Sequence, residues 1–386
     1  MLKQSESYHV IKGGIQLLPS TYSSMKNILL YTVLMLLLPL HLAGQRKSKS
    51  AEPLNVIILI GDGMGAAQLS VPYYYGEGDP VFTKFKNIGM VLTSSARHKV
   101  TDSAAGASAM FTGSKTYNNA IGVDNDTIYR KNLVEILSDD RDYMTGLVTT
   151  SSVTDATPAG FYAHVSERTM HYDIAKELLS SEIDFFAGGG LQYFISTDGT
   201  DYFKKNNIEM YNSELSRIKK PEAGKRYGFL MAMDGLPAML DGRGDYLPKA
   251  SGIALDYLSK SEQGFILMIE GAQIDWAGHS NNTDYLLTEM LDFEEAVQVA
   301  YNFAKKDKNT LLIVTADHET GGFTLGASGE SLYGEDYATI VPSFATRSHS
   351  ATLVPLLAYG PGSDSFRGIL ANTDIFSRIL DAIKKH

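Results

Sequence analysis

The sequence contains no cysteine and only one tryptophan. Without cysteine the chain cannot form disulfides, thiolate metal sites or iron-sulfur clusters, and it has no thiol nucleophile. Histidine and the carboxylates are therefore the only strong metal ligands that it offers. Positive charge is also scarce, because 34 Lys and Arg stand against 44 Asp and Glu, a formal net charge of -10. This balance argues against a nucleic-acid footprint, so an anionic substrate must be held by metals or by a few arginines.

The composition is that of a chain with a large folded core. Of its 386 residues, 44% are hydrophobic and 20% are charged, and 35 are glycine. These proportions exclude disordered, collagen-like and coiled-coil proteins. The sequence shows no repeat period and no low-complexity tract. We therefore expect a single domain with insertions over residues 45–386.

An apolar run near the N-terminus predicts export. Residues 28–40 are almost free of polar side chains, follow Met25 and Lys26, and precede Gly44. A run of about 13 residues is too short to span a bilayer, which takes roughly 20. We predict a signal peptide cut near Gly44, with translation starting at Met25 and an upstream extension before it, so that residues 1–44 precede a periplasmic or secreted protein. A short membrane anchor is the alternative.

Short apolar runs alternate with helical patterns along the rest of the chain. This alternation predicts an α/β fold of the doubly wound kind, with a mostly parallel central sheet and helices on both faces. A charged, turn-rich stretch is interpreted as a surface excursion. The predicted strands are 55–60, 144–150, 183–187, 265–269, 310–315 and 353–359, the predicted helices are 133–138, 172–179, 250–258, 283–305 and 374–384, and the excursion is 197–228.

Carboxylates and histidines follow three of the predicted strands, at the end of a parallel sheet where ligands gather. Asp62 stands in a Gly-rich turn after the first strand, where a carboxylate could hold a cation, although such a sequence also fits a plain tight turn. Asp317 and His318 follow another strand. Asp275 and His279 are four residues apart, so one helical turn would aim both at one metal. Together these residues predict a metal site.

Ser103 begins a segment of small residues that predicts a helix. This serine could simply belong to an N-cap with close helix packing behind it. At a helix N-terminus beside a metal, however, its hydroxyl would lose a proton more readily and become a nucleophile for an anionic centre. Arg168 taken alone could be a surface charge, but a guanidinium grips two phosphate oxygens at once. The occurrence of both residues, with Asp155 between them in the chain, favours the functional interpretation.

Taken together and in order, these segments resemble the alkaline phosphatase family. The resemblance extends from Asn55 to Pro361 and implies an alkaline-phosphatase-like fold that hydrolyses small-molecule phosphate monoesters. Few residues lie between Gly322 and Arg347, so we expect only small cap insertions over the site. The segments that carry the resemblance are 61–65, 101–113, 155–168, 270–279, 315–322 and 348–362.

The resemblance implies two zinc ions and one magnesium ion, a phosphoserine intermediate, alkaline activity and a homodimer. Ser103 is the implied nucleophile, which also coordinates the second zinc when deprotonated. Arg168 is the implied phosphate clamp, and Asp102 the carboxylate that orients it. Sets that combine histidine with carboxylates suit zinc, and a set made only of oxygen donors suits magnesium. The implied ligands are Asp275, His279 and His349 for the first zinc, Asp62, Asp317 and His318 for the second, and Asp62, Thr157 and Glu270 for magnesium.

Asp155 and Trp276 depart from the better-known members of the family. Members similar to the enteric bacterial enzyme pair Asp at the first position with Lys at the second, and many others have His at one or both. We expect Asp155 to reach magnesium through water. Trp276 cannot supply the ammonium that would hold phosphate, so we expect weaker product binding. In the site implied for magnesium, zinc or cobalt stays an alternative.

Two other classes of function remain open from the sequence. A sulfatase or phosphodiesterase of the same fold would keep similar metal ligands but change the nucleophile and its surroundings. Sulfatases have Pro and Arg after the nucleophile, whereas Ala104 and Ala105 follow Ser103, and diesterases usually have Thr in its place. A non-catalytic phosphate-binding protein would need no nucleophile, and the presence of Ser103 argues against it.

Overall fold

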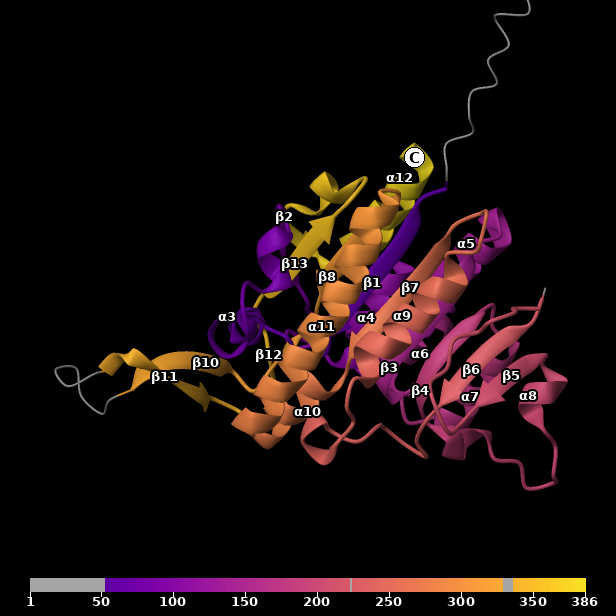
Figure 1. The fold of residues 1–386 in the computed structure, drawn as a ribbon, viewed down its shortest axis with the longest axis horizontal. Helices are drawn as coiled ribbons and strands as arrows, with labels where there is room; N and C mark the ends of the chain where they lie inside the picture. The colour runs from indigo at the N-terminus through magenta and orange to yellow at the C-terminus, as the bar shows by residue number, and fades with distance from the viewer. Residues whose placement is uncertain (1–52, 223, 329–335) are drawn as a thin grey trace, which may run out of the picture. The chain divides into compact units, whose positions relative to one another are not determined.

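The structure is a computed structural model, which describes residues 53–222, 224–328 and 336–386 (Figure 1). The predicted upstream extension, the signal peptide and its cleavage site lie outside the described residues. Within the described ranges, no helix has both the length and the apolar character needed to cross a membrane.

A sheet of ten strands, in the order β14-β2-β13-β8-β1-β7-β3-β4-β6-β5, forms the centre of the described part. Every neighbouring pair is parallel except the two that β13 makes, because β13 runs opposite to both β8 and β2. The predicted doubly wound, mostly parallel architecture is confirmed. The strands are β1 (Asn55–Gly61), β2 (Asn87–Leu92), β3 (Met144–Ser152), β4 (Phe185–Gly189), β5 (Ile208–Tyr211), β6 (Arg226–Leu230), β7 (Phe265–Gly271), β8 (Thr310–Thr315), β13 (Val354–Tyr359) and β14 (Gly368–Ala371).

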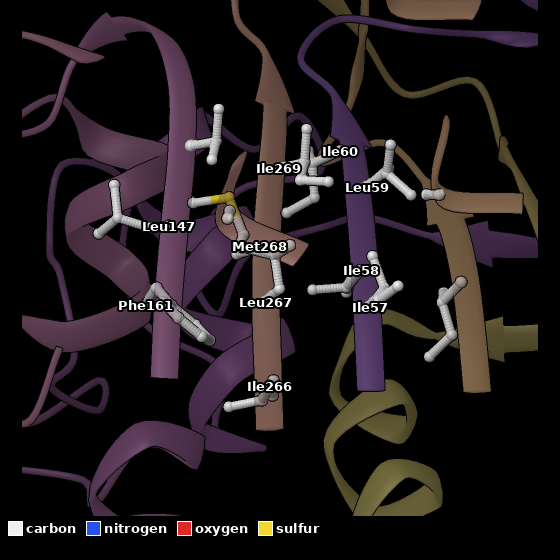
Figure 2. Close-up of a cluster of buried hydrophobic side chains, with 14 of the residues drawn as sticks. Ile57, Ile58, Leu59, Ile60, Leu147, Phe161, Ile266, Leu267, Met268 and Ile269 are labelled. Atoms are coloured by element: carbon white, nitrogen blue, oxygen red, sulfur yellow. The ribbon is translucent and has the colours of Figure 1, made fainter. Parts of the chain in front are cut away.

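The central strands are apolar at successive positions because helices cover both of their faces. In β1, Val56 to Ile60 are fully buried, and so are Ile266 to Ile269 of β7 beside it (Figure 2). Such unbroken apolar runs are typical of parallel sheets, whereas a sheet with one wet face alternates polar and apolar residues. Each buried side chain of this size contributes about 1.5–3 kcal/mol, so these strands form a rigid base for the residues at their ends.

The helices form two groups. The long α11 packs against α9 and against β1, β7 and β8, whereas α4 packs against α6 and α12 on the other side of the sheet (Figure 1). The longer helices are α4 (Ser103–Thr112), α5 (Leu133–Arg141), α6 (Ala156–Tyr162), α7 (His171–Ser180), α9 (Tyr246–Leu258), α10 (Gln273–Ser280), α11 (Thr283–Asp307) and α12 (Asn372–Lys385), and the short ones are α2 (Ala66–Leu69), α3 (Val71–Tyr75) and α8 (Tyr202–Lys205).

The prediction of a surface excursion over residues 197–228 is wrong in part. The segment contains β5 and the start of β6, which pair in parallel and extend the central sheet beyond β4. Tyr227 and Phe229 of β6 are buried in the core. The neighbouring Arg226 gave the segment a polar character, but its guanidinium donates to the backbone carbonyls of Leu178 and Ile183 and so reaches inward.

Two small sheets lie outside the central one. The pair β9 (Glu319–Thr320) and β12 (His349–Ser350) brings His349 opposite Thr320. The antiparallel pair β10 (Phe323–Ser328) and β11 (Asp336–Phe344) occupies most of the stretch between Gly322 and Arg347. This hairpin agrees with the expectation that only a small insertion lies there.

His164 links α5 to α7 through ion pairs with two glutamates. Its Nε2 lies 3.4 Å from Oε2 of Glu135, and its Nδ1 lies 3.5 Å from Oε2 of Glu177. The imidazole also stacks on Tyr129, with ring centroids 4.0 Å apart, and its Nε2 lies 3.1 Å from the carbonyl oxygen of Arg130. Burial alone would lower the pKa of His164, but the two glutamates outweigh it and raise this pKa to about 9.

We expect His164 to make the stability of the fold depend on pH. Since its folded-state pKa lies above the ordinary value of about 6.5, protonated His164 stabilises the fold fully below about pH 6.5, and this contribution is lost as the pH rises through 9. His164→Asn should lower the free energy of unfolding by about 2 kcal/mol near pH 6 and much less near pH 10. Urea unfolding at both pH values measures this, with the exposed His98→Asn as control. An equal loss at both would contradict the prediction.

Candidate active site

The predicted site residues meet at one edge of the sheet, at the ends of four adjacent strands. Asp62 follows β1, Glu270 lies near the end of β7, and Asp317 and His318 follow β8. The loop after β3 leads into α6, which carries Thr157. Because these strands are parallel, their carboxyl ends lie together, as the strand-end argument predicts.

His349 reaches the same edge by a different route. It precedes β13 rather than following it, and β13 is the strand that runs antiparallel to its neighbours. The amino end of β13 therefore lies beside the carboxyl ends of the other strands. The antiparallel direction of this one strand explains why His349 joins the cluster.

Asp275, His279 and His349 form a group whose ligand atoms lie within 4.8 Å of one another. The Nδ1 of His279 lies 2.6 Å from the carbonyl oxygen of Arg347, and the Nδ1 of His349 lies 2.9 Å from that of Thr101. A carbonyl oxygen can only accept, so each Nδ1 carries the proton and each Nε2 presents a lone pair.

The two lone pairs of this group face each other. The Nε2 atoms of His279 and His349 are 3.0 Å apart, and each lies 3.4 Å from Oδ1 of Asp275. Burial opposes the ionisation of Asp275. When no cation is bound and the imidazoles carry a second proton, the hydrogen bond from His349 and the charge of the imidazoles outweigh burial and lower the pKa of Asp275 to about 2. Two imidazole nitrogens and a carboxylate that converge in this way fit a zinc ion with an open position.

A second group lies deeper in the site. The ligand atoms of Asp62, Asp275 and His318 lie within 4.8 Å of one another. Oδ2 of Asp317 is 3.2 Å from Nε2 of His318, and the other oxygen of Asp317 accepts from the backbone N–H of Gly63 and of His318. Oδ1 of Asp62 and Oδ2 of Asp317 are buried without a hydrogen-bond partner. Burying a carboxylate oxygen without a partner costs free energy unless a cation binds it. This group therefore also fits a metal ion.

Thr157 and Glu270, the other oxygen ligands implied for magnesium, lie near Asp62. The hydroxyl of Thr157 donates to Oδ2 of Asp62 at 3.2 Å, and Oε2 of Glu270 accepts from Thr149 and Ser151. Burial raises the pKa of Glu270 to about 8 and raises the pKa of Asp62 well above its usual range. A divalent cation would favour the charged forms of both, and a set made only of oxygen atoms suits magnesium.

Ser103 is the first residue of α4 and faces the second group. Asp102 caps the helix by accepting from the backbone N–H of Ala105 at 3.0 Å. The side chain of Ser103 is almost fully buried, and its Oγ lies 3.2 Å from Nε2 of His318. The positive end of the helix dipole favours negative charge at this position. The structure therefore places a hydroxyl where its deprotonation and the binding of an anion are both favoured.

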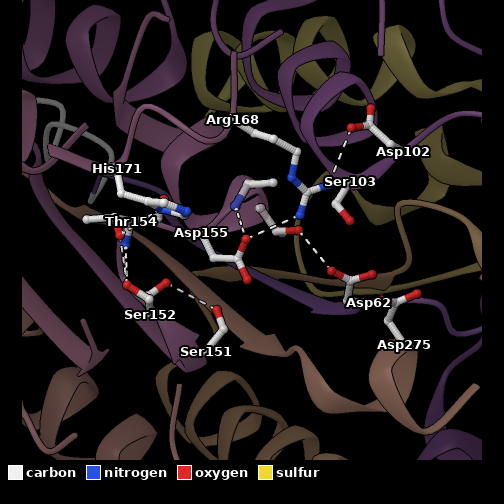
Figure 3. Close-up of polar contacts among 12 residues, drawn as sticks. Asp62, Asp102, Ser103, Ser151, Ser152, Thr154, Asp155, Arg168, His171 and Asp275 are labelled. Carbon is white, nitrogen blue, oxygen red and sulfur yellow. Dashed lines mark hydrogen bonds and ion pairs between the residues drawn. The ribbon is translucent and has the colours of Figure 1, made fainter. Parts of the chain in front are cut away.

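Arg168 lies beside Ser103 and is held by two carboxylates (Figure 3). Its Nη1 donates to Oδ2 of Asp102 at 3.3 Å, and its Nη2 donates to Oδ1 of Asp155 at 3.2 Å. Asp102 also accepts from the backbone N–H of Asn119 at 3.0 Å, which fixes its position. Sequence reasoning predicted Asp155 only as a partner of water around magnesium, and it missed the direct ion pair with Arg168.

Two further positioning residues were not predicted from the sequence. Thr320 donates its hydroxyl to Oδ1 of Asp275 and lies 3.2 Å from Nδ1 of His318, so it touches ligands of both groups. The buried carboxylate of Glu319 accepts from Gln68 and from Ser350, the neighbour of His349. Both residues directly follow His318 in the sequence, and this position could have pointed to them. Residues next to a metal ligand often supply the hydrogen bonds that orient it.

The sequence of this chain is similar to those of known alkaline phosphatases. The family model described as alkaline phosphatase matches residues 54–341. Alkaline phosphatase 4 of Bacillus subtilis is 35% identical over 424 residues, which cover 89% of this chain and 91% of that protein.

Solved structures agree with the sequence comparison. The alkaline phosphatase of the Antarctic bacterium TAB5 is 48% identical, with a TM-score of 0.83 over 86% of this chain and 98% of that one. A variant of the TAB5 enzyme in which one histidine is replaced by aspartate matches equally well, with a TM-score of 0.82, and is described with magnesium bound in its M3 site.

Proposed function

Because this chain belongs to the alkaline phosphatase family and hydrolyses phosphate monoesters with divalent metal cofactors, we propose that its reaction passes through a phosphoserine formed on Ser103. The observation that carries the proposal is the placement of one buried serine hydroxyl at a helix N-terminus, 3.2 Å from His318 and beside Arg168. A binding protein would need no such nucleophile.

The proposed reaction consists of two displacements at phosphorus. The Oγ of Ser103 forms a bond to phosphorus, the bond to the ester oxygen breaks, and the alcohol leaves with a proton. Water then attacks the phosphoserine from the side that the alcohol vacated, which releases inorganic phosphate and regenerates the serine hydroxyl. Arg168 binds non-bridging oxygens and opposes the charge that develops on them, while Asp102 and Asp155 keep its guanidinium in place.

We propose two zinc ions and one magnesium ion as the cofactors. When bound, they would promote deprotonation of the oxygen nucleophiles and stabilise the charge on the leaving oxygen. Asp275, His279 and His349 would hold one zinc, and Asp62, Asp317 and His318 the other. Asp62, Thr157 and Glu270 would hold magnesium, with Asp155 behind them. The magnesium described in the M3 site of a histidine-to-aspartate variant of the TAB5 enzyme supports magnesium as the third ion.

A substrate panel tests the proposed function. The metal-loaded enzyme should release p-nitrophenol from its phosphate monoester much faster than from a phosphate diester or a sulfate ester, with rates that rise toward alkaline pH. Preferential cleavage of the diester or the sulfate ester would keep the fold and the metal site but overturn the substrate assignment.

Trp276 lies next to Asp275 and provides no cation for the phosphate product. We expect Trp276→Lys to tighten the inhibition by inorganic phosphate by about tenfold, since a hydrogen bond to a charged group is worth about 1.5–3 kcal/mol before solvent screening reduces it. Turnover should fall because phosphate leaves more slowly. Steady-state kinetics with added phosphate measure both effects, and Trp276→Leu controls for loss of the ring. An unchanged inhibition constant and turnover would contradict the prediction.

Export and assembly complete the proposal. The apolar run over residues 28–40 supports a signal peptide and a periplasmic or secreted enzyme, with the catalytic domain over residues 45–386. The family resemblance supports a homodimer. N-terminal sequencing of the exported protein and light scattering of the purified enzyme would test these two points.

A further inference from the structure

The helix that carries two of the proposed zinc ligands is short. Helix α10 spans Gln273–Ser280, and Asp275 and His279 lie one turn apart on it. A helix of this length has little stability of its own. Contacts with neighbouring elements must therefore fix its position. The side chain at its first residue, Gln273, makes several of these contacts.

The amide of Gln273 is fully buried, and all of its polar atoms have partners. Its Nε2 donates to the carbonyl oxygens of Thr150 at 3.1 Å and of Leu236 at 2.8 Å. Its Oε1 accepts from the hydroxyl of Tyr285 at 2.6 Å. Because the two carbonyl oxygens can only accept, Nε2 must face them, and Oε1 is left to accept from Tyr285. One side chain thus joins α10 to β3, to α11 and to the loop after β6.

The loop after β6, residues 231–245, is anchored to the same helix α11. The side chain of Arg243 is only 1% exposed, and its guanidinium forms ion pairs with Glu289 and with Asp292, the latter at 2.8 Å. Glu289 also accepts from the backbone N–H of Met239 at 2.9 Å. Tyr285 and Glu289 are one turn apart on α11. The contacts therefore close a ring that runs from α11 through Tyr285, Gln273, Leu236 and the loop back to Glu289.

The 231–245 loop also touches the side chain that follows Asp275. A Cβ atom built on Gly235 would lie 2.6 Å from Cη2 of Trp276, so the backbone of the loop lies directly against the indole ring. Trp276 is the only tryptophan in the chain. Its fluorescence therefore reports how α10 and the loop pack against each other.

We propose that Gln273 and Tyr285 are positioning residues that hold helix α10, and with it Asp275 and His279, in the geometry that binds zinc. Neither residue belongs to the groups of side chains that could hold a metal ion. They act by fixing the position of α10. A shift of this helix would move Asp275 and His279 together and so change the geometry in which they bind zinc. The inference rests on the proposed roles of Asp275 and His279 as zinc ligands.

Tyr285→Phe is the sharpest test, because it removes one hydroxyl and leaves the ring. Zinc-loaded enzyme is mixed with excess chelator, and the zinc released is followed with a chromogenic dye while Trp276 emission is recorded. We expect zinc to leave about tenfold faster than from the wild type, in line with other groups that orient metal ligands. The Trp276 emission should also shift. Gln273→Glu, which keeps the acceptor for Tyr285 but loses both donors, should have at least as large an effect.

Tyr143→Phe is the matched control. The hydroxyl of Tyr143 also makes a buried hydrogen bond, to the carbonyl oxygen of Leu54 at 2.8 Å, but Tyr143 precedes β3 and so lies at the opposite end of the strand from the site. Its loss should lower thermal stability without changing zinc release or Trp276 emission. Wild-type zinc release and emission in Tyr285→Phe, or equal changes in Tyr143→Phe, would overturn the proposal.

An Asp275→Asn variant separates this inference from the function on which it rests. If Asp275→Asn loses zinc but Tyr285→Phe releases it at the wild-type rate, the positioning role is wrong and the ligand assignment stands. If Asp275→Asn binds and releases zinc as the wild type does, the ligand assignment itself fails, and the positioning role fails with it.

Discussion

Ser103→Ala should lower kcat for a phosphate monoester at least about a thousandfold, which corresponds to roughly 4 kcal/mol of transition-state stabilisation. The variant removes the oxygen that would form the bond to phosphorus. Arg168 and the proposed metal ligands stay, so phosphate binding and a slow direct attack by water should persist. Stopped-flow and steady-state assays of p-nitrophenol release measure the loss.

A serine elsewhere provides the control for this substitution. Ser251 is buried in α9, and its hydroxyl donates to the carbonyl oxygen of Leu247 at 2.7 Å. Ser251→Ala removes the same atom far from the reacting groups and should leave kcat unchanged. If Ser103→Ala kept wild-type turnover while binding its metals normally, water rather than Ser103 would be the first nucleophile.

Removal of divalent metals should abolish activity and also destabilise the protein. Without a cation, the lone pairs of His279 and His349 face each other at 3.0 Å, and buried oxygens of Asp62 and Asp317 have no hydrogen-bond partner. A ligand present at a thousand times its dissociation constant stabilises the fold by about 4 kcal/mol. We therefore expect chelator-treated protein to unfold at a clearly lower temperature, as measured by scanning calorimetry.

Zinc and magnesium added back should restore both activity and thermal stability. Chelator already saturated with zinc controls for effects of the chelator itself. An enzyme that kept its activity after complete metal removal, verified by elemental analysis, would contradict the proposed ligand groups.

The strand-end argument predicted the part of the site that depends on parallel strands. Asp62 and Asp317 could be placed together from the sequence, because each directly follows a buried apolar run and such runs end at one edge of a parallel sheet. His349 could not be placed in this way. It precedes a strand, and the sequence of β13 gives no sign that it runs antiparallel, so only the family resemblance pointed to this residue.

The parts that sequence reasoning missed depend on contacts between distant segments. Arg226 made β6 look exposed. The direct contact of Asp155 with Arg168 depends on the course of the chain between α6 and α7, where the backbone N–H of Arg168 donates to the carbonyl oxygen of Asn119. The bond between Tyr285 and Gln273 needs α11 to pack over α10. Amphipathic patterns show that a helix is buried but not which polar side chain it meets across the interface.

The most direct test of the central claim is to trap the phosphoserine. The metal-loaded enzyme is quenched in acid during turnover of p-nitrophenyl phosphate and digested, and its peptides are analysed by mass spectrometry. We predict one added phosphoryl group on the peptide that contains Ser103, and none in Ser103→Ala. A phosphoryl group found on another residue, or none in an enzyme that is turning over with a burst of p-nitrophenol release, would contradict the proposed role of Ser103.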